Sequence, residues 1–259
     1  LVAKGKAYYC FCTKEELAER RAAAEAEGKT WKYDKHCLHL SPEEVQAKLD
    51  AGVPYVIRQN VPETGEASFD DVLYGHIAVD CAELDDNVLI KADGMPTYNM
   101  AVVVDDHTMG ITHVLRGNEY LSSTPKYNLL YEAFGWEKPV YIHLTPVMKD
   151  QHRKLSKRDG SASVSMYREK GYAPACITEY VMTLLNSNYE EWRAANPEKP
   201  FTEFPFSIKK MSASGALFDA DKLYDICKNT VSRMTAAEAY DGLADWAREY
   251  DAQLYACLA

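Results

Sequence analysis

The first third of the chain alternates apolar segments with polar segments that carry helix start and stop signals. Aromatic and apolar residues at 7–12 predict a strand, and residues 55–59 predict another. Two capping boxes lie between these strands, and each opens a predicted helix that ends at a glycine. They are Thr13 with Glu16, ending near Gly28, and Ser41 with Glu44, ending at Gly52. Strands and helices therefore mix in this region.

The pattern changes after Asn87. Short apolar runs at 88–90 and 101–104 are typical of buried parallel strands, and residues 111–115 predict a further strand. A helix is predicted from 122 to 134. Alternating strands and capped helices indicate part of a doubly wound α/β fold. Beyond Lys170 the pattern is mostly helical, and the polar, proline-bearing segment 186–206 predicts a surface loop.

Three of the seven cysteines lie close to a histidine in sequence, as Cys10-x-Cys12 and Cys37-x-His39. Residues two apart on an extended segment share a face, so each pair can converge on one point. Three thiolates and an imidazole suit tetrahedral zinc, and four protein ligands would make the site structural. The alternative is four unconnected residues. An odd cysteine count argues against a disulfide framework.

The net charge of −10 argues against a nucleic-acid binder on composition alone, but a local basic patch interrupts the acidic chain. Five cations lie between residues 149 and 158, namely Lys149, Arg153, Lys154, Lys157 and Arg158, against one acid, Asp150. Such a patch is compatible with a polyanionic ligand, although a solvated basic loop is the alternative. No apolar run is long enough to span a membrane, and no signal-peptide pattern is present. We therefore expect a cytoplasmic protein with no membrane partner.

A third candidate region extends from residue 91 to residue 120. Arg116 follows a predicted strand, where ligands of open α/β sheets collect, and its guanidinium could clamp a carboxylate. The run Asp105-Asp106-His107 suggests a metal site, but acids at such a turn more often act as caps.

The order of these features resembles a known family. The runs that carry the resemblance are 93–98, 103–106, 111–117 and 123–125, followed by the pentapeptide at 154–158. Together they resemble the bacterial-type glutamyl-tRNA synthetases, which are class I aminoacyl-tRNA synthetases. The pentapeptide is similar to the second class I signature, whose parent form is Lys-Met-Ser-Lys-Ser.

The resemblance implies an α/β fold: the second half of a class I synthetase Rossmann-like domain, with a zinc-bearing α+β insertion before it and a mostly helical stem-contact region after it. It divides the chain into an acceptor-end-binding insertion with the zinc site (1–87), the half Rossmann-like domain (88–145), the lysine-serine loop with the stem-contact region (146–235), and the start of the helical anticodon-binding region (236–259).

The implied activity is that of a glutamate–tRNA ligase. With ATP and Mg²⁺ such an enzyme converts L-glutamate to glutamyl-adenylate, then transfers glutamate to the 3′ end of tRNA-Glu. By resemblance, Tyr98 and Arg116 bind glutamate, whereas Glu119, Tyr120, Val147 and Lys157 bind ATP. The catalytic loop residues are Lys154, Ser156, Lys157 and Arg158, and the structural Zn²⁺ ligands are Cys10, Cys12, Cys37 and His39.

Two departures from the family pattern shape these expectations. The first class I signature, His-Ile-Gly-His, is absent, so we expect a fragment without the first half of the catalytic fold and without the anticodon-binding domain. Such a fragment is expected to be inactive alone. Residues 223–234 also depart from the family pattern, which affects the expected contacts with the tRNA stem.

Several alternatives stay open. The chain could act as a zinc-dependent tRNA-binding module without catalysis, or derive from a synthetase that also charges tRNA-Gln. The long stretch after Arg158 disfavours a short paralogue that glutamylates a modified tRNA base. The run 112–117 differs from the corresponding signature of glutaminyl-tRNA synthetase.

Overall fold

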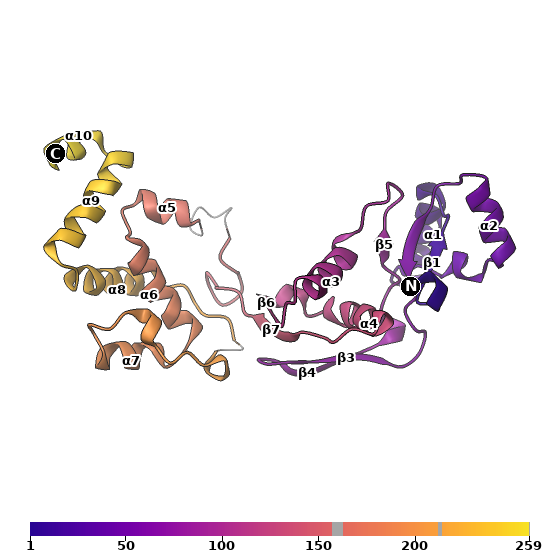
Figure 1. Cartoon of the computed structure of the whole chain (residues 1–259), viewed down its shortest axis with the longest axis horizontal. Helices are drawn as coiled ribbons and strands as arrows, with labels where there is room; N and C mark the ends of the chain where they lie inside the picture. Colours follow the sequence, from indigo (N-terminus) through magenta and orange to yellow (C-terminus); the bar gives the residue numbers. More distant parts are fainter. Residues whose placement is uncertain (157–162, 212–213, 259) are drawn as a thin grey trace. The chain divides into compact units, whose positions relative to one another are not determined.

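The structure is a computed structural model that describes residues 1–156, 163–211 and 214–258. The chain divides into two compact units, Leu1–His143 and Leu144–Ala259 (Figure 1). Each unit is described by itself below.

The first unit begins with a three-stranded antiparallel sheet of order β1-β2-β5. Its strands are β1 (Ala7–Cys10), β2 (Val56–Gln59) and β5 (Val88–Ile90), with Ala7 opposite Gln59 in register. Helices α1 (Lys14–Ala26) and α2 (Pro42–Asp50) lie between β1 and β2 in the chain, and the short 3-10 helices are η1 (Val2–Lys4) and η2 (His36–His39). The predicted strands at 7–12 and 55–59 are thus confirmed, with slightly shorter bounds.

Both predicted capping boxes are formed. Thr13 accepts a hydrogen bond from the Glu16 backbone N–H, whose side chain bonds back to the Thr13 N–H, and Ser41 and Glu44 do the same. Each pair satisfies two of the backbone donors that a helix start leaves without partners.

A second, mixed sheet has the order β4-β3-β7-β6. The strands are β3 (Glu66–Asp71), β4 (Gly75–Asp80), β6 (His113–Gly117) and β7 (Val140–Leu144). β3 runs antiparallel to β4 and parallel to β7. The helices of this part are α3 (Tyr98–Thr108) and α4 (Thr124–Phe134), with 3-10 turns η3 (Cys81–Glu83) and η4 (Asn118–Tyr120). Figure 1 shows α4 running along β3, with which it is in contact. The α/β class is confirmed.

The prediction of a buried parallel strand at 101–104 is wrong, because these residues lie inside α3. A run of four apolar residues has no periodicity that separates a strand from a buried helical turn. Val103 is the fully buried member of the run, as expected when a helix turns one side inward. The strand predicted at 88–90 exists as β5, but it pairs antiparallel with β2 rather than in a parallel sheet.

Helix α4 joins the two sheets through two core clusters. Leu89 of β5, Val103 of α3 and Leu130 of α4 are buried together with two tyrosines of α4. A second cluster joins β3 to α4 through Ala67 and Leu129. Helix α4 thus packs against elements of both sheets.

The second unit is helical. Its helices are α5 (Val164–Glu169), α6 (Pro174–Leu185), α7 (Tyr189–Ala195), α8 (Ala220–Ser232), α9 (Ala236–Tyr250) and α10 (Ala252–Leu258), with 3-10 turns η6 (Phe201–Glu203) and η7 (Ile208–Lys210). The helical prediction beyond Lys170 is confirmed. Among the described residues, no helix is long and apolar enough to cross a membrane.

The surface loop predicted at 186–206 is wrong in its first half, where α7 forms. Tyr189 is 1% exposed and donates a hydrogen bond of 2.6 Å to Glu179 of α6. Arg193, one turn later on the same face, forms an ion pair with the same carboxylate at 2.6 Å. Tertiary contacts thus stabilise a seven-residue helix that would be marginal alone.

Candidate functional site

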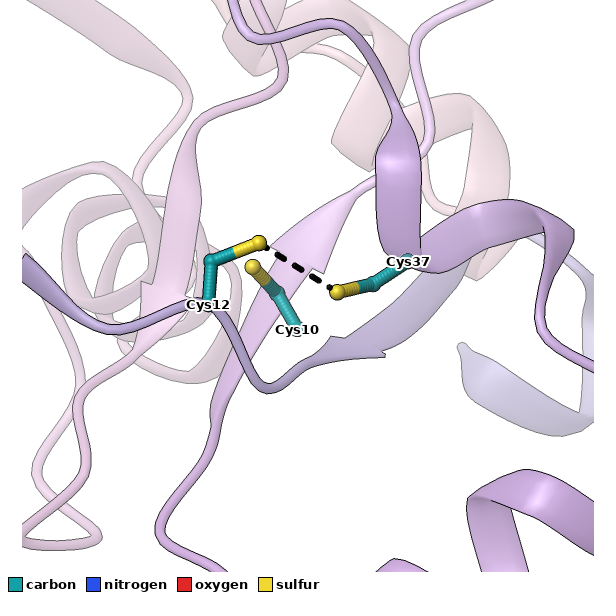
Figure 2. Close-up of side chains that lie close together, drawn as sticks. All are labelled: Cys10, Cys12 and Cys37. Carbon is teal, nitrogen blue, oxygen red and sulfur yellow. Dashed lines mark hydrogen bonds between the residues drawn. The ribbon is translucent and has the colours of Figure 1, made fainter. Parts of the chain in front are cut away.

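Three thiols from two segments meet at the end of β1. Cys10 ends the strand, Cys12 follows two residues later, and Cys37 comes from η2. Figure 2 shows the three side chains pointing toward one another. Their sulfur atoms lie within 4.8 Å of each other, and Cys12 Sγ is 3.5 Å from Cys37 Sγ. Tetrahedral zinc, with Zn–S distances of about 2.3 Å, would separate its sulfurs by about 3.8 Å. The donor set and its spacing therefore fit zinc.

His39 does not join this group in the described part of the chain, and it is exposed. The expectation that it shares a face with Cys37 assumed an extended backbone. Residues His36–His39 instead form a 3-10 turn, in which residues two apart point in different directions. The role of His39 as a ligand stays a prediction.

A tyrosine that the sequence did not single out lies at the sulfurs instead. The Tyr33 hydroxyl is 3.3 Å from Cys10 Sγ and 3.4 Å from Cys12 Sγ, and it accepts a hydrogen bond of 3.2 Å from the Cys37 N–H. Beside the three sulfurs, the phenol oxygen is thus a fourth atom that could bind a metal. Its place four residues before Cys37 is the only signal that the sequence offers.

The cluster is electrostatically prepared for anionic sulfur. Arg58 of β2 is 8% exposed, and its guanidinium lies 4.1 Å from the centroid of the Tyr33 ring. Hydrogen bonding to Cys37 holds the pKa of the Cys10 thiol well below its usual range, with further lowering from Tyr33 and Arg58 against the effect of burial. The same bond to Cys10 raises the pKa of Cys37. One thiolate is therefore favoured before any metal binds, which is the form that metals require.

A buried ion pair fixes the segment that carries Tyr33 and Cys37. Lys35 Nζ lies 2.9 Å from Asp86 Oδ1, and both side chains are almost fully buried. Asp86 also accepts hydrogen bonds from the Tyr8 hydroxyl at 2.5 Å and the Val61 N–H at 3.0 Å. The carboxylate thereby ties the cysteine segment to β1 and to the chain after β2.

Arg116, near the end of β6, lies among aromatic rings. The distances from its Cζ to the ring centroids are 4.9 Å for Tyr120, 5.0 Å for Tyr127 and 5.7 Å for Tyr141. Rings at these distances attract a cation and restrict its side-chain motion.

Polar contacts also fix one edge of the Arg116 guanidinium. Nε donates to His143 Nε2 at 3.1 Å, and Nη2 donates to Thr124 Oγ1 at 2.7 Å. His143 is 0% exposed, and its Nδ1 lies 2.7 Å from Asp71 Oδ2. Among the described residues, no group forms a hydrogen bond with Nη1 of Arg116. The Nη1 and Nη2 end of the guanidinium can therefore donate hydrogen bonds to a carboxylate.

Two further predicted residues lie beside Arg116. The Tyr98 ring, at the start of α3, lies 5.9 Å from the Tyr120 ring by centroids, and Tyr120 is the ring next to Arg116. Burial raises the pKa of Tyr98, as does hydrogen bonding to Tyr120. Glu119 is exposed in η4. The structure thus brings Tyr98, Tyr120 and Arg116 together, on three different elements.

The remaining predicted residues belong to the second unit. Val147 O accepts a hydrogen bond of 2.8 Å from the Leu155 N–H, and Met148 is bridged to Lys154, so residues 147–155 form a tight antiparallel hairpin. Asp150 closes its turn by accepting from the His152 and Arg153 N–H groups, both at 2.9 Å. Lys154 is exposed and Ser156 half-buried, whereas Lys157 and Arg158 lie outside the described residues.

The comparisons with known proteins define the class first. Residues 1–225 match the family model described as tRNA synthetases class I (E and Q), catalytic domain. The chain belongs to this family. The sequence-based expectation of a class I synthetase catalytic region is therefore confirmed.

The curated relatives that the chain resembles are glutamate–tRNA ligases. The chain is 55% identical over 228 residues to the glutamate–tRNA ligase of Clostridium botulinum (strain Eklund 17B / Type B), and 57% identical over 223 residues to that of Clostridium acetobutylicum. Each match covers 86% of this chain and 46% of the relative. The chain thus spans about half the length of the curated relatives that it matches.

Solved structures agree with this result. A glutamate tRNA ligase from Elizabethkingia meningosepticum, crystallised in complex with its amino acid, superposes with a TM-score of 0.82 at 34% identity, covering 93% of this chain and 52% of that one. The glutamate-tRNA synthetase of Elizabethkingia anophelis gives a TM-score of 0.80 at 32% identity, covering 94% of this chain and 55% of that one.

Proposed function

We propose that this chain supplies part of a glutamate–tRNA ligase, which activates L-glutamate with ATP and Mg²⁺ and transfers it to the 3′ end of tRNA-Glu. The observation that carries the proposal is the fixed Arg116 guanidinium, whose Nη1 and Nη2 end has N–H donors available for a carboxylate, in a chain of this synthetase family. The names of the curated relatives support the same substrate class.

In this proposal Arg116 and Tyr98 bind glutamate. Charge-assisted, paired hydrogen bonds from a guanidinium recognise a carboxylate better than a single ammonium can. Tyr98 is 55% exposed, so its side chain is accessible to a ligand beside Arg116. We call Arg116 with Tyr98, Tyr120, Thr124 and His143 the Arg116 niche. The adenylate then forms when the α-carboxylate of glutamate attacks the α-phosphate of ATP and pyrophosphate leaves.

For the nucleotide, we propose contacts from Glu119, Tyr120 and Val147. Lys154, Ser156, Lys157 and Arg158 would stabilise phosphate charge as pyrophosphate departs, with Lys157 also contacting ATP. No protein nucleophile is needed, because the substrate carboxylate attacks. Catalysis then rests on positioning and on charge stabilisation.

We further propose that residues 1–87 form the insertion that receives the tRNA acceptor end, that 88–145 form the half Rossmann-like domain, that 146–235 contact the tRNA stem, and that 236–259 begin the anticodon-binding helices. Cys10, Cys12 and Cys37 would hold one Zn²⁺, with Tyr33 or His39 as fourth ligand. When bound, the ion would cross-link β1 to η2 and so shape the insertion.

The test is ATP–pyrophosphate exchange by the full-length gene product, with Mg²⁺ and cognate tRNA. Exchange should depend on L-glutamate and should not occur with L-glutamine or L-aspartate. Charging of purified tRNA-Glu and tRNA-Gln decides whether the enzyme accepts one tRNA or both. Binding of tRNA without exchange would favour a second function, that of a zinc-dependent tRNA-binding module. The cysteine cluster, which does not include Arg116, supports this alternative.

A further inference from the structure

His143 and Thr124 contact one edge of the Arg116 guanidinium, with Asp71 behind His143, and the hydrogen-bond partners of these residues determine which atoms carry protons. Asp71 Oδ1 accepts hydrogen bonds from the Leu73 and Tyr74 N–H groups at 2.9 and 3.0 Å, and Oδ2 accepts from the His143 N–H at 3.0 Å. Burial alone would raise the pKa of Asp71, but hydrogen bonds from His143 and from these backbone groups lower it. Asp71 is therefore a carboxylate that only accepts.

One tautomer of His143 fits its neighbours, which are Asp71 at Nδ1 and both Arg116 Nε and Thr124 Oγ1 at Nε2. Nδ1 lies 2.7 Å from the Asp71 carboxylate, so Nδ1 carries the proton. Nε2 lies 3.1 Å from Nε of Arg116, which is always a donor, so Nε2 presents its lone pair. Burial lowers the pKa of His143, and the charge of Arg116 lowers it further, against the raising effect of the hydrogen bond that His143 donates to Asp71. The neutral ring with a proton on Nδ1 is thus the form that fits.

Thr124 completes the arrangement. Its hydroxyl donates to the Tyr120 carbonyl at 2.8 Å, so its oxygen accepts the 2.7 Å hydrogen bond from Nη2 of Arg116. Asp71, His143 and Thr124 have the composition of a nucleophilic triad. However, His143 and Thr124 are both 0% exposed, and the Tyr120 carbonyl at 2.8 Å is a nearer acceptor for the Thr124 proton than His143 Nε2 at 3.2 Å. The arrangement therefore has no accessible nucleophile, and its remaining contact is Arg116.

We propose that Asp71 and His143 are positioning residues, which select one edge of the Arg116 guanidinium and turn its opposite end, Nη1 and Nη2, toward the ligand carboxylate. This inference rests on the proposed function, because it assumes that Arg116 binds glutamate. Asp71 comes from β3, His143 from β7 and Arg116 from β6, three neighbouring strands of one sheet. The sheet thus carries a hydrogen-bonded row that ends at the substrate.

Three variants separate positioning from a structural role. Asp71→Asn places an amide beside Nδ1, which moves the ring proton to Nε2 and sets it against the Arg116 N–H. His143→Leu removes the acceptor for Arg116. His143→Gln keeps a carbonyl that can accept from Nε and is the conservative rescue. Each is made in the full-length gene product, with Arg116→Ala as reference.

The readout is the KM for glutamate and the KM for ATP in pyrophosphate exchange. We expect Asp71→Asn and His143→Leu to raise the glutamate KM about 10-fold or more, because a misplaced binding group loses most of its contribution. The ATP KM should change less than about twofold, and His143→Gln should recover most of the glutamate affinity. An equal rise for both substrates, or an unchanged glutamate KM while Arg116→Ala raises it, would overturn the inference.

Failure of the underlying function has a different signature. If Arg116→Ala leaves the glutamate KM unchanged, the glutamate site itself is misplaced. A second measurement covers variants that do not fold: the ¹⁵N spectrum of the His143 ring in the unaltered chain should show a protonated Nδ1 and a bare Nε2 near pH 7.5. The opposite tautomer, or a doubly protonated ring, contradicts the inference without any mutation.

Discussion

The cysteine cluster and the Arg116 niche lie in the same unit, yet their polar groups are satisfied in different ways. At the cysteine cluster, three sulfurs and the Tyr33 hydroxyl have mainly one another as partners. At the Arg116 niche, one edge of the guanidinium is already fixed by His143 and Thr124. In our proposal an ion completes the first region, whereas the guanidinium of the second is already held by side chains of the protein. Removing the metal should therefore destabilise the cysteine cluster more than removing glutamate destabilises the Arg116 niche.

The largest expected effect is on the cysteine cluster. Protein purified without chelator should contain one zinc per chain, and Cys37→Ser should release it and destabilise residues 1–59 by several kcal/mol, since binding free energy is also folding free energy. Hydrogen exchange, followed by mass spectrometry, should show the loss in β1 and η2 but not in β6. Cys81→Ser is the matched control, because Cys81 is equally buried in the same unit outside the cluster. Metal-free protein with unchanged exchange rates would contradict the zinc site.

The next effect concerns the niche. Arg116→Ala should raise the KM for glutamate by on the order of 100-fold, because a lost charge-assisted pair costs about 2–3 kcal/mol. The KM for ATP should stay nearly constant, and the zinc content should not change. Arg116→Lys keeps the charge but loses the fork, so it should recover little of the affinity. Equal rises for glutamate and ATP would count against this role.

A smaller effect decides the fourth zinc ligand. If Tyr33 binds the ion, Tyr33→Phe should weaken zinc affinity about 10-fold or more, whereas His39→Ala should leave it nearly unchanged. Competition with a fluorescent zinc chelator measures both variants under the same conditions. The reverse result would restore His39 as the ligand and would imply that η2 rearranges when the ion binds.

The smallest effect is the pH dependence of the niche. The folded pKa of His143 is lowered, mainly by burial, so the neutral ring contributes stability that is present above its unfolded pKa of about 6.5 and is lost as the pH falls. Asp71, whose folded pKa is also lowered, adds a loss of the same sign at lower pH. Arg116 and Glu119 are the other charged groups acting on the ring.

Thermal unfolding between pH 8 and pH 5 checks this expectation. The melting temperature should fall with acid, and His143→Gln should flatten the part of the curve near pH 6. A curve of the same shape for both proteins would show that His143 does not titrate with folding.

The sequence by itself determined the features that depend on neighbours along the chain. The capping boxes at Thr13 and Ser41 and the strand that begins at Ala7 formed where local chemistry favours them. Helix α4 likewise ends at Gly135. Family resemblance, rather than spacing, also predicts Tyr98 and Tyr120 as site residues, but it does not predict Thr124 and His143. Tyr98 and Arg116 come together only because α3 and β6 are held by α4 and the sheet.

Only the tertiary structure decided the rest, since it depends on contacts between segments far apart in the sequence. The run 101–104 became a helix because α4 and β5 bury one side of it, and a short apolar run does not encode that choice. His39 lies outside the cysteine cluster, contrary to the prediction, because η2 is a tight turn rather than an extended segment. The Tyr33 hydroxyl lies at the cluster instead. Asp71 and His143 are 72 residues apart, and no pattern along the chain pairs them. Strand order in the sheet brings their side chains together behind Arg116.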